Sequence, residues 1–176
     1  AWIGFGLSWL IFGTLGKIYN WGNSVTGCLV ITAGLANTSF VGIPIIQALY
    51  GEEGVQIALL IDQAGSFIIV SSLAIIVASV YSFEKKRKRD ITQKILTFPP
   101  FMFFLIAFGL NFYGVEIGEN LDFFLQLITV TLTPVALTSV GLQVKMNFEA
   151  LRSKFLWYGL GYKLVLIPLI ILVLFK

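Results

Sequence analysis

The chain has few charged residues and almost none of the residues that bind metals. None of its 176 residues is His and only one, Cys28, is Cys, so a disulfide framework is excluded and a zinc or haem site is not expected. A Ser-His hydrolase needs a His that this chain lacks, and we expect no cofactor. Charged residues make up 12% of the chain and hydrophobic residues 57%, with a mean hydropathy of +0.91. This composition excludes an ordinary soluble domain and indicates a polytopic membrane protein.

Long apolar runs follow one another along the chain. About twenty apolar residues span the hydrocarbon layer of a bilayer, which is about 30 Å thick. We therefore expect an all-α membrane bundle, with helices over residues 2–15, 24–50, 55–81, 99–113, 123–143 and 154–175. Residues 91–97 are predicted to form an amphipathic piece on the membrane surface. The first helix is short and the chain begins without Met inside it, so we expect a fragment of a longer protein.

The charges between the expected helices alternate in sign, and they predict the orientation. Lys and Arg gather in the loops after the first, third and fifth helices, whereas the loops after the second and fourth hold only acidic residues. By the positive-inside rule, the basic loops are cytoplasmic and the first residue lies outside. The basic run sets orientation, with contact to anionic lipid as a further role, and we expect no nucleic-acid partner. The basic residues are Lys17, Lys85, Lys86, Arg87, Lys88, Arg89, Lys94, Lys145, Arg152 and Lys154; the acidic residues are Glu52, Glu53, Glu116, Glu119 and Asp122.

The sequence NTSFVGIP, residues 37–44, interrupts the second apolar run. Asn37, Thr38 and Ser39 offer the backbone alternative hydrogen bonds, Gly42 relaxes φ, and Pro44 suits the first turn of a new helix. We predict a break between Asn37 and Gly42, facing a cavity, with a backbone carbonyl near Ala36 left without its helical partner. The two helix ends would then attract an anion near Pro44 and a cation near Ala36. The alternative is a proline kink in an ordinary membrane helix.

The run GLANTSFVGIPIIQALYGEEG closely resembles the first broken-helix motif of the auxin efflux carrier (AEC) family of secondary transporters. Bacterial members are often described as malonate or malate permeases. The resemblance implies ten membrane helices in two inverted five-helix repeats, with a crossover of broken helices in each. The segment TLTPVALTSVGLQV resembles the seventh helix of the family.

Matched in order, the six expected helices are similar to the third to eighth helices of an AEC carrier, and the first two and last two are absent. The resemblance implies that residues 1–83 belong to the transport domain and that 84–98 form the basic cytoplasmic junction between the repeats. Residues 99–143 would belong to the scaffold domain, and 144–176 would hold a cytoplasmic loop and the counterpart of the first helix. We expect that this part alone cannot transport.

Two ionisable residues, Asp62 and Lys163, lie inside expected helices. A charge in the hydrocarbon costs at least about 2.5 to 3.5 kcal/mol, so such a residue is a functional candidate by default. We predict that Asp62 carries the coupling proton or ion, that Lys163 attracts an anion, and that the two approach each other or line one cavity. The alternatives are that Lys163 extends to the cytoplasmic interface and that Asp62 lies near the outer one. Around Pro134, the hydroxyls of Thr129 and Thr133 are predicted to bond to carbonyls that the proline frees.

The function predicted from these features is secondary transport of a small organic anion, such as a carboxylate or an auxin-like compound, by alternating access with proton or sodium coupling. The substrate-binding candidates are Asn37, Thr38, Ser39, Gly42, Pro44 and Lys163. One alternative is a non-transporting membrane sensor or interaction module on the same fold. Another, an intramembrane aspartyl protease, needs a second carboxylate beside Asp62. The sequence leaves open the substrate, the coupling ion, the direction of transport and whether the chain forms a homo-oligomer.

Overall fold

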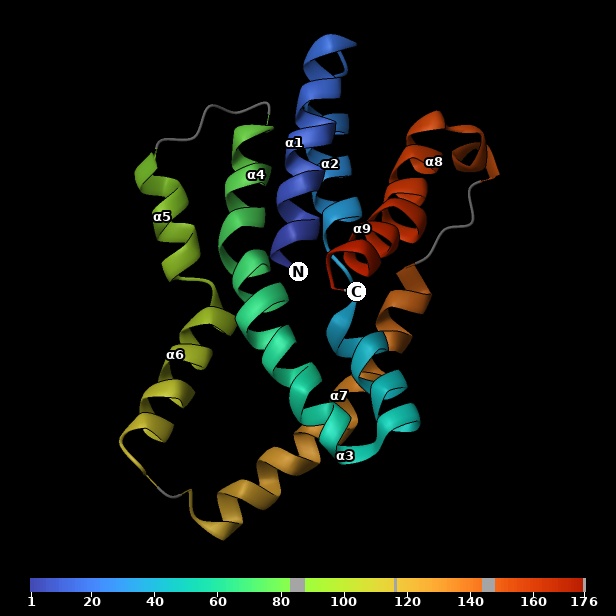
Figure 1. The fold of residues 1–176 in the computed structure, drawn as a ribbon. Coiled ribbons are helices and arrows are strands. Elements are labelled where there is room, and N and C mark those ends of the chain that lie inside the picture. The colour runs from blue at the N-terminus through green and yellow to red at the C-terminus, as the bar shows by residue number, and fades with distance from the viewer. Residues whose placement is uncertain (83–87, 116, 144–147, 176) are drawn as a thin grey trace. The chain divides into compact units, whose positions relative to one another are not determined.

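A computed structural model describes residues 1–82, 88–115, 117–143 and 148–175 (Figure 1). Most of the basic run, residues 83–87, and Lys145 lie outside the described residues. Most of the described residues lie in helices and none lies in a strand, which confirms the predicted all-α fold. The helices are α1 Trp2–Ile18, α2 Asn23–Gly34, η1 Thr38–Gly42, α3 Ile43–Ile61, η2 Asp62–Phe67, η3 Ile69–Leu73, α4 Ala74–Val80, α5 Lys88–Leu96, α6 Pro99–Phe112, α7 Glu119–Gln143, η4 Phe148–Arg152, α8 Lys154–Gly161, η5 Tyr162–Leu166 and α9 Ile167–Leu174.

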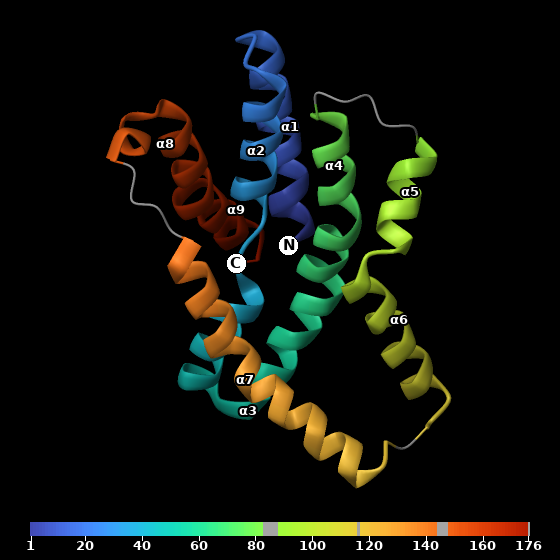
Figure 2. The ribbon, with the colours of Figure 1, turned by 180° about the vertical axis from the view of Figure 1, so that it is seen from behind.

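Within the described residues, three helical stretches are long and apolar enough to cross a membrane: Asn23–Val80, Glu119–Gln143 and Lys154–Leu174. The first contains two of the expected helices, which are separated at Gly51. Gly51 has φ of 65° and ψ of −161°, a backbone conformation that a residue with a Cβ rarely adopts. Residues on both sides of Gly51 line one groove, so the chain reverses direction there (Figure 2). The third expected helix therefore begins directly after Gly51, earlier than the predicted residue 55.

The chain divides into two compact units, residues 1–98 with 148–176 and residues 99–147. In the first unit, α2 contacts α1, α4 and α8 (Figures 1 and 2). Small residues allow α1 and α2 to approach closely, as is usual between membrane helices. The buried Ser8 hydroxyl donates to the Val30 carbonyl at 2.9 Å, and Gly34 lies against the Ser8 side chain. The core cluster comprises Phe5, Phe12, Leu29, Val30, Ala33, Ile69, Val77 and Tyr162.

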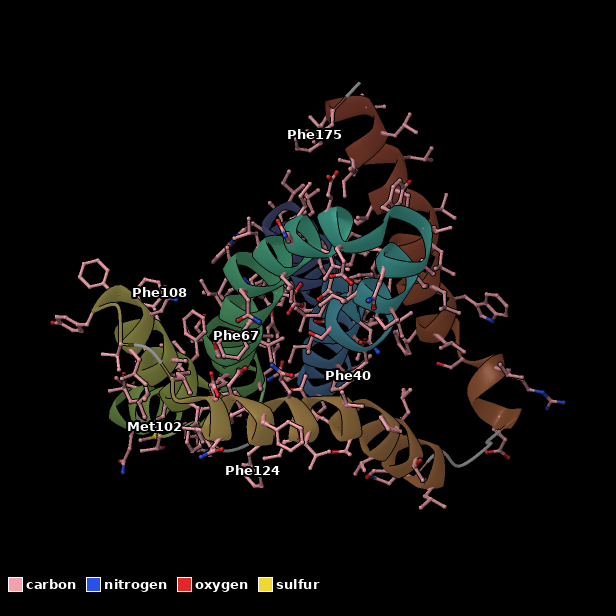
Figure 3. The ribbon with its side chains drawn as sticks, turned by 90° about the horizontal axis from the view of Figure 1, so that it is seen from below. Phe40, Phe67, Met102, Phe108, Phe124 and Phe175 are labelled. Carbon is pink, nitrogen blue, oxygen red and sulfur yellow. The ribbon has the colours of Figure 1, made fainter. Side chains whose placement is uncertain are left out.

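The second unit consists of α6 and α7. None of its described side chains is buried, although its helices are strongly apolar. Phe108 of α6 is 62% exposed and Phe124 of α7 is 57% exposed (Figure 3). Because exposed apolar area of this extent is costly in water, these helices suit a lipid environment.

Four of the helical segments, η1, η2, η3 and η5, are π-helical. In a π-helix, the N–H of each residue bonds to the carbonyl five residues earlier, which is rare and often found at functional sites. Three of these segments hold candidate site residues: Thr38 and Ser39 lie in η1, Asp62 begins η2, and Lys163 lies in η5. These π-helical segments were not predicted from the sequence.

Candidate functional site

The predicted break in the second apolar run exists, but it lies slightly earlier than predicted. α2 ends at Gly34, and Leu35 has an extended backbone with ψ of 135°. Helical structure resumes at Thr38. Figures 1 and 2 show the thin connection between α2 and the helical segment that follows. The interruption therefore covers residues 35–37, and the prediction that it begins at Asn37 and that the upstream helix reaches Ala36 is wrong.

Pro44 does not cause the interruption. It lies near the start of α3, after the helix has already resumed at Thr38, and so beyond the interruption. Asn37 organises the restart of the helix, because its Oδ1 accepts from the Phe40 N–H at 3.1 Å and its carbonyl accepts from the Gly42 N–H at 3.1 Å. In a continuous helix the Phe40 N–H would donate to the Ala36 carbonyl. The predicted loss of a helical hydrogen bond near Ala36 is thus confirmed.

The carboxylate of Asp62, a residue of η2 on the helix after Gly51, lies at the start of the half-helix that follows the break. The Asp62 side chain is buried, at 4% exposure. The carboxylate accepts from the Thr38 hydroxyl, and the Ser39 hydroxyl lies 3.0 Å from both carboxylate oxygens. Gln63 adds a long contact of 3.5 Å through Nε2. A negative charge is stabilised at a helix N-terminus, because the aligned peptide dipoles place positive partial charge there. The position that the sequence analysis predicts for an anion is therefore occupied by a carboxylate of the chain itself.

Lys163 occupies the other side of the break, at the end of α2. Its Nζ donates to the Leu35 carbonyl at 2.6 Å and to the Thr32 carbonyl at 3.2 Å. These carbonyls lie at a helix C-terminus, where cations are favoured and where carbonyls lack helical partners. No ion pair joins Lys163 to Asp62, two residues that the structure describes fully. The ammonium thus stands where the sequence analysis expects a cation to bind.

A small cavity lies beside the break. Its volume is about 160 Å³, which corresponds to roughly five water molecules. Leu35, Thr38 and Lys163 line it, so it connects the end of α2, the start of the next half-helix and η5. Ser66 also lines it; this side chain is only 6% exposed and makes no hydrogen bond with the described residues. Asp62 does not itself line the cavity, but its carboxylate accepts from Thr38, which does. The full lining is Ala1, Gly4, Ala33, Gly34, Leu35, Ala36, Thr38, Ile61, Ser66, Lys163, Ile167 and Ile171.

Two larger grooves are mainly apolar. One, of about 630 Å³, lies between α2 and α8 and includes Cys28 and Lys163. The other, of about 530 Å³, lies between the helical segments that precede and follow Gly51. Neither contains the buried carboxylate. Among the described residues, no group of three or more His, Cys, Asp or Glu side chains could hold a metal ion.

The candidate residues of the sequence analysis thus fall into two groups. Direct hydrogen bonds join Thr38 and Ser39 to Asp62, while Asn37 caps the helix next to them through the Phe40 N–H. Of the predicted residues, Thr38 and Lys163 line the cavity. Gly42 and Pro44 shape the helix that follows, and Pro44 is not among the residues that line the cavity. Ser66 shares a helix face with Asp62 in the sequence, but it was not predicted to be a binding residue. The Thr32 and Leu35 carbonyls were not predicted either, because backbone carbonyls leave no sequence signal.

A helix broken inside an apolar span, with opposite charges at its two ends and a cavity beside it, is typical of integral membrane transporters. The chain belongs to the family described as "Membrane transport protein", whose model matches residues 1–95, more than half of the chain. This confirms the AEC resemblance.

Two curated relatives carry the name "uncharacterized transporter". One, from Methanocaldococcus jannaschii, is 27% identical over 148 residues, covering 81% of this chain and 46% of the relative. The other, from Methanothermobacter thermautotrophicus, is 28% identical over 124 residues, covering 70% and 39% respectively. The chain therefore spans less than half the length of each. No solved structure matches it.

Proposed function

We propose that the intact protein is a secondary transporter that moves a small organic anion, such as a carboxylate or an auxin-like compound, by alternating access. One observation carries this proposal: a broken membrane helix holds a buried carboxylate at one end and an ammonium at the other, beside a cavity of about 160 Å³. Buried charges within a membrane span are costly, and such charges mark the pathways of ions and substrates. The cavity volume suits a small acid rather than a large solute.

The proposed substrate-binding groups are Asn37, Thr38, Ser39, Gly42, Pro44 and Lys163. An ammonium has three N–H donors, and Lys163 uses two of them on carbonyls, so one remains for a substrate carboxylate. Thr38 and Ser39 now donate to Asp62. A proton on the Asp62 carboxylate would weaken its attraction for both hydroxyls and release them toward the substrate. Asp62 is thus the proposed coupling residue, and substrate and proton would bind together.

The proposed orientation places the basic loops in the cytoplasm and the first residue outside. Residues 1–83 would belong to the mobile transport domain and residues 99–143 to the scaffold domain, with the basic junction 84–98 between them and 144–176 beginning the second repeat. The separation of residues 99–147 as a compact unit supports a division at Pro99.

Uptake into proteoliposomes of the intact protein tests the proposal. Radiolabelled acetate, malonate, malate and indole-3-acetate are offered with and without an imposed proton or sodium gradient. The expected result is saturable, gradient-dependent accumulation of at least one of these anions, absent from protein-free liposomes. Specific binding of an anion with no flux under either gradient would favour the sensor or interaction module instead. If none of the four anions shows either binding or flux, an anion transporter of this type is refuted.

A further inference from the structure

Lys163 stands where a broken membrane helix usually exposes oxygen atoms. Past the end of α2, the carbonyls of the last turn have no helical N–H to accept from. The Leu35 carbonyl, at 2.6 Å from Nζ, and the Thr32 carbonyl, at 3.2 Å, point toward one positive charge. Unwound carbonyls at such an end are the groups that bind monovalent coupling ions in broken-helix transporters.

A second, independent observation marks the same place as a ligand site. Ser66 is 94% buried by its 6% exposure, lines the same cavity, and its hydroxyl has no hydrogen-bond partner among the described residues. None of the fully enclosed side-chain oxygen or nitrogen atoms among the described residues lacks a partner, so the Ser66 oxygen is open to this cavity and can bind a water, a substrate group or a cation. The cavity thus offers an oxygen from η2 in addition to the two carbonyls of α2.

We infer that the end of α2 is a monovalent-cation site and that the Lys163 ammonium is its built-in occupant. A tethered ammonium provides the same single positive charge as Na⁺, at an effective concentration that no free ion matches. Wild-type protein then needs no Na⁺ at this position, and removal of the ammonium opens the site to Na⁺. If the intact protein is a transporter, this occupancy excludes Na⁺ as the coupling ion at this site and leaves the proton. That consequence rests on the proposed function, whereas the cation site itself does not.

Thermal unfolding of the purified intact protein tests the inference. Melting is compared in NaCl, KCl and choline chloride at equal ionic strength, for wild type and for Lys163→Ala. Wild type is expected to melt at the same Tm in NaCl and choline chloride. For Lys163→Ala, the Tm in NaCl is expected to rise above that in choline chloride by about 3 °C or more, because a ligand that binds only the folded state stabilises it. Lys154→Ala is the matched control, since this lysine lies over the Phe155 ring and away from the break.

A sodium-specific rise in the Tm of wild type overturns the inference. The absence of such a rise in a folded Lys163→Ala variant also overturns it. If Lys163→Ala is recovered folded only when Na⁺ is present, the inference is supported. If Lys163→Ala is not recovered in any salt, Lys163→Ser is measured instead, because its small hydroxyl leaves room for the ion. A Lys163→Ser variant whose Tm does not respond to Na⁺, or that is not recovered folded even with Na⁺, overturns the inference. Lys163→Arg keeps a cation on the carbonyls and should behave as wild type. These Tm measurements do not depend on transport. A failure of the transport hypothesis can therefore be distinguished from a failure of the cation-site inference.

Discussion

The α2–α3 break and α7 combine the same ingredients, a proline and nearby hydroxyl side chains, yet only the first is interrupted. α7 runs from Glu119 to Gln143 with Pro134 inside it. Its described threonine hydroxyls donate within the helix: Thr131 to the Leu127 and Ile128 carbonyls, and Thr138 to the Pro134 carbonyl. At the break, in contrast, the hydroxyls of Thr38 and Ser39 donate to a carboxylate on another segment.

The difference shows that a proline does not by itself break a membrane helix. Pro44 lies beyond the interruption, and Pro134 is accommodated within a helix. The break instead occurs where the freed carbonyls of α2 have a partner from elsewhere in the fold, the Lys163 ammonium. At the restart of the helix, Asp62 accepts from the side-chain hydroxyls of Thr38 and Ser39. Thr129 donates to the Leu125 carbonyl, and no described side chain of α7 donates to the Val130 carbonyl that Pro134 frees. Threonine hydroxyls of α7 therefore bond within the helix, but the predicted hydrogen bond to the Val130 carbonyl is not observed among the described side chains. The Thr133 side chain lies outside the described residues.

The largest effect is expected from the buried carboxylate. Asp62→Ala should lower gradient-driven anion uptake by roughly a hundredfold, equivalent to about 2.7 kcal/mol, because it removes the coupling group and leaves two hydroxyls without an acceptor. Asp122→Ala in α7 is the control, since Asp122 is exposed and, among the described residues, its carboxylate accepts from Gln126 alone. Initial uptake rates in proteoliposomes measure the effect. A comparable loss in both variants would mean that the break is no more important than α7.

A smaller effect is expected where α2 meets α1. In Gly34→Ala the new Cβ would lie 2.9 Å from the Ser8 Cβ and 3.1 Å from the Phe5 Cδ2. Overpacking of this kind costs about 1–3 kcal/mol, and the Tm in detergent should fall. Gly141→Ala in α7 meets no described atom within 4 Å, so its better helix propensity should leave the Tm unchanged or slightly raised. Equal melting of the two variants would contradict the packing described for the end of α2.

The smallest effect is expected from the Asn37 cap. Asn37→Ala removes the acceptor of the Phe40 N–H and should cost about 1 kcal/mol, or about fivefold in uptake, with expression reduced less than uptake. Thr131→Ala removes only bonds within α7 and should change uptake by less than about twofold. If expression and uptake of Asn37→Ala fall together, the break is only a structural kink.

Hydropathy predicted the helices well because lipid-exposed helices must be apolar along their length, and α1, α6, α7 and α8 through α9 begin and end within a few residues of the predicted positions. Asp62 and Lys163 were identifiable because an isolated charge stands out in an apolar run. The polar segment that begins at Asn37 indicated a break, but not where α2 ends.

The position of the break and the partners of both charges depend on tertiary contacts. Gly34 ends α2 where it packs against Ser8, and the Lys163 ammonium contacts carbonyls more than a hundred residues away in the sequence. Carbonyl groups are the same in every residue, so no pattern of side chains could indicate them. The π-helical turns at Asp62 and Lys163 likewise have no known side-chain pattern.

Thiol labelling of the intact protein in membranes tests most directly whether the break, unlike α7, faces a water-filled substrate cavity. Cys28 is exposed and is first replaced by Ser. Single cysteines are then introduced as Ala36→Cys, in the cavity lining, and Val135→Cys, on α7, where 64% exposure is expected to face lipid. A membrane-impermeant maleimide reacts with thiolates, which form in water and not in hydrocarbon. Ala36→Cys should label and be protected by the transported anion, whereas Val135→Cys should label only after the membrane is dissolved. Equal labelling at both positions, or none at Ala36→Cys, would contradict the account.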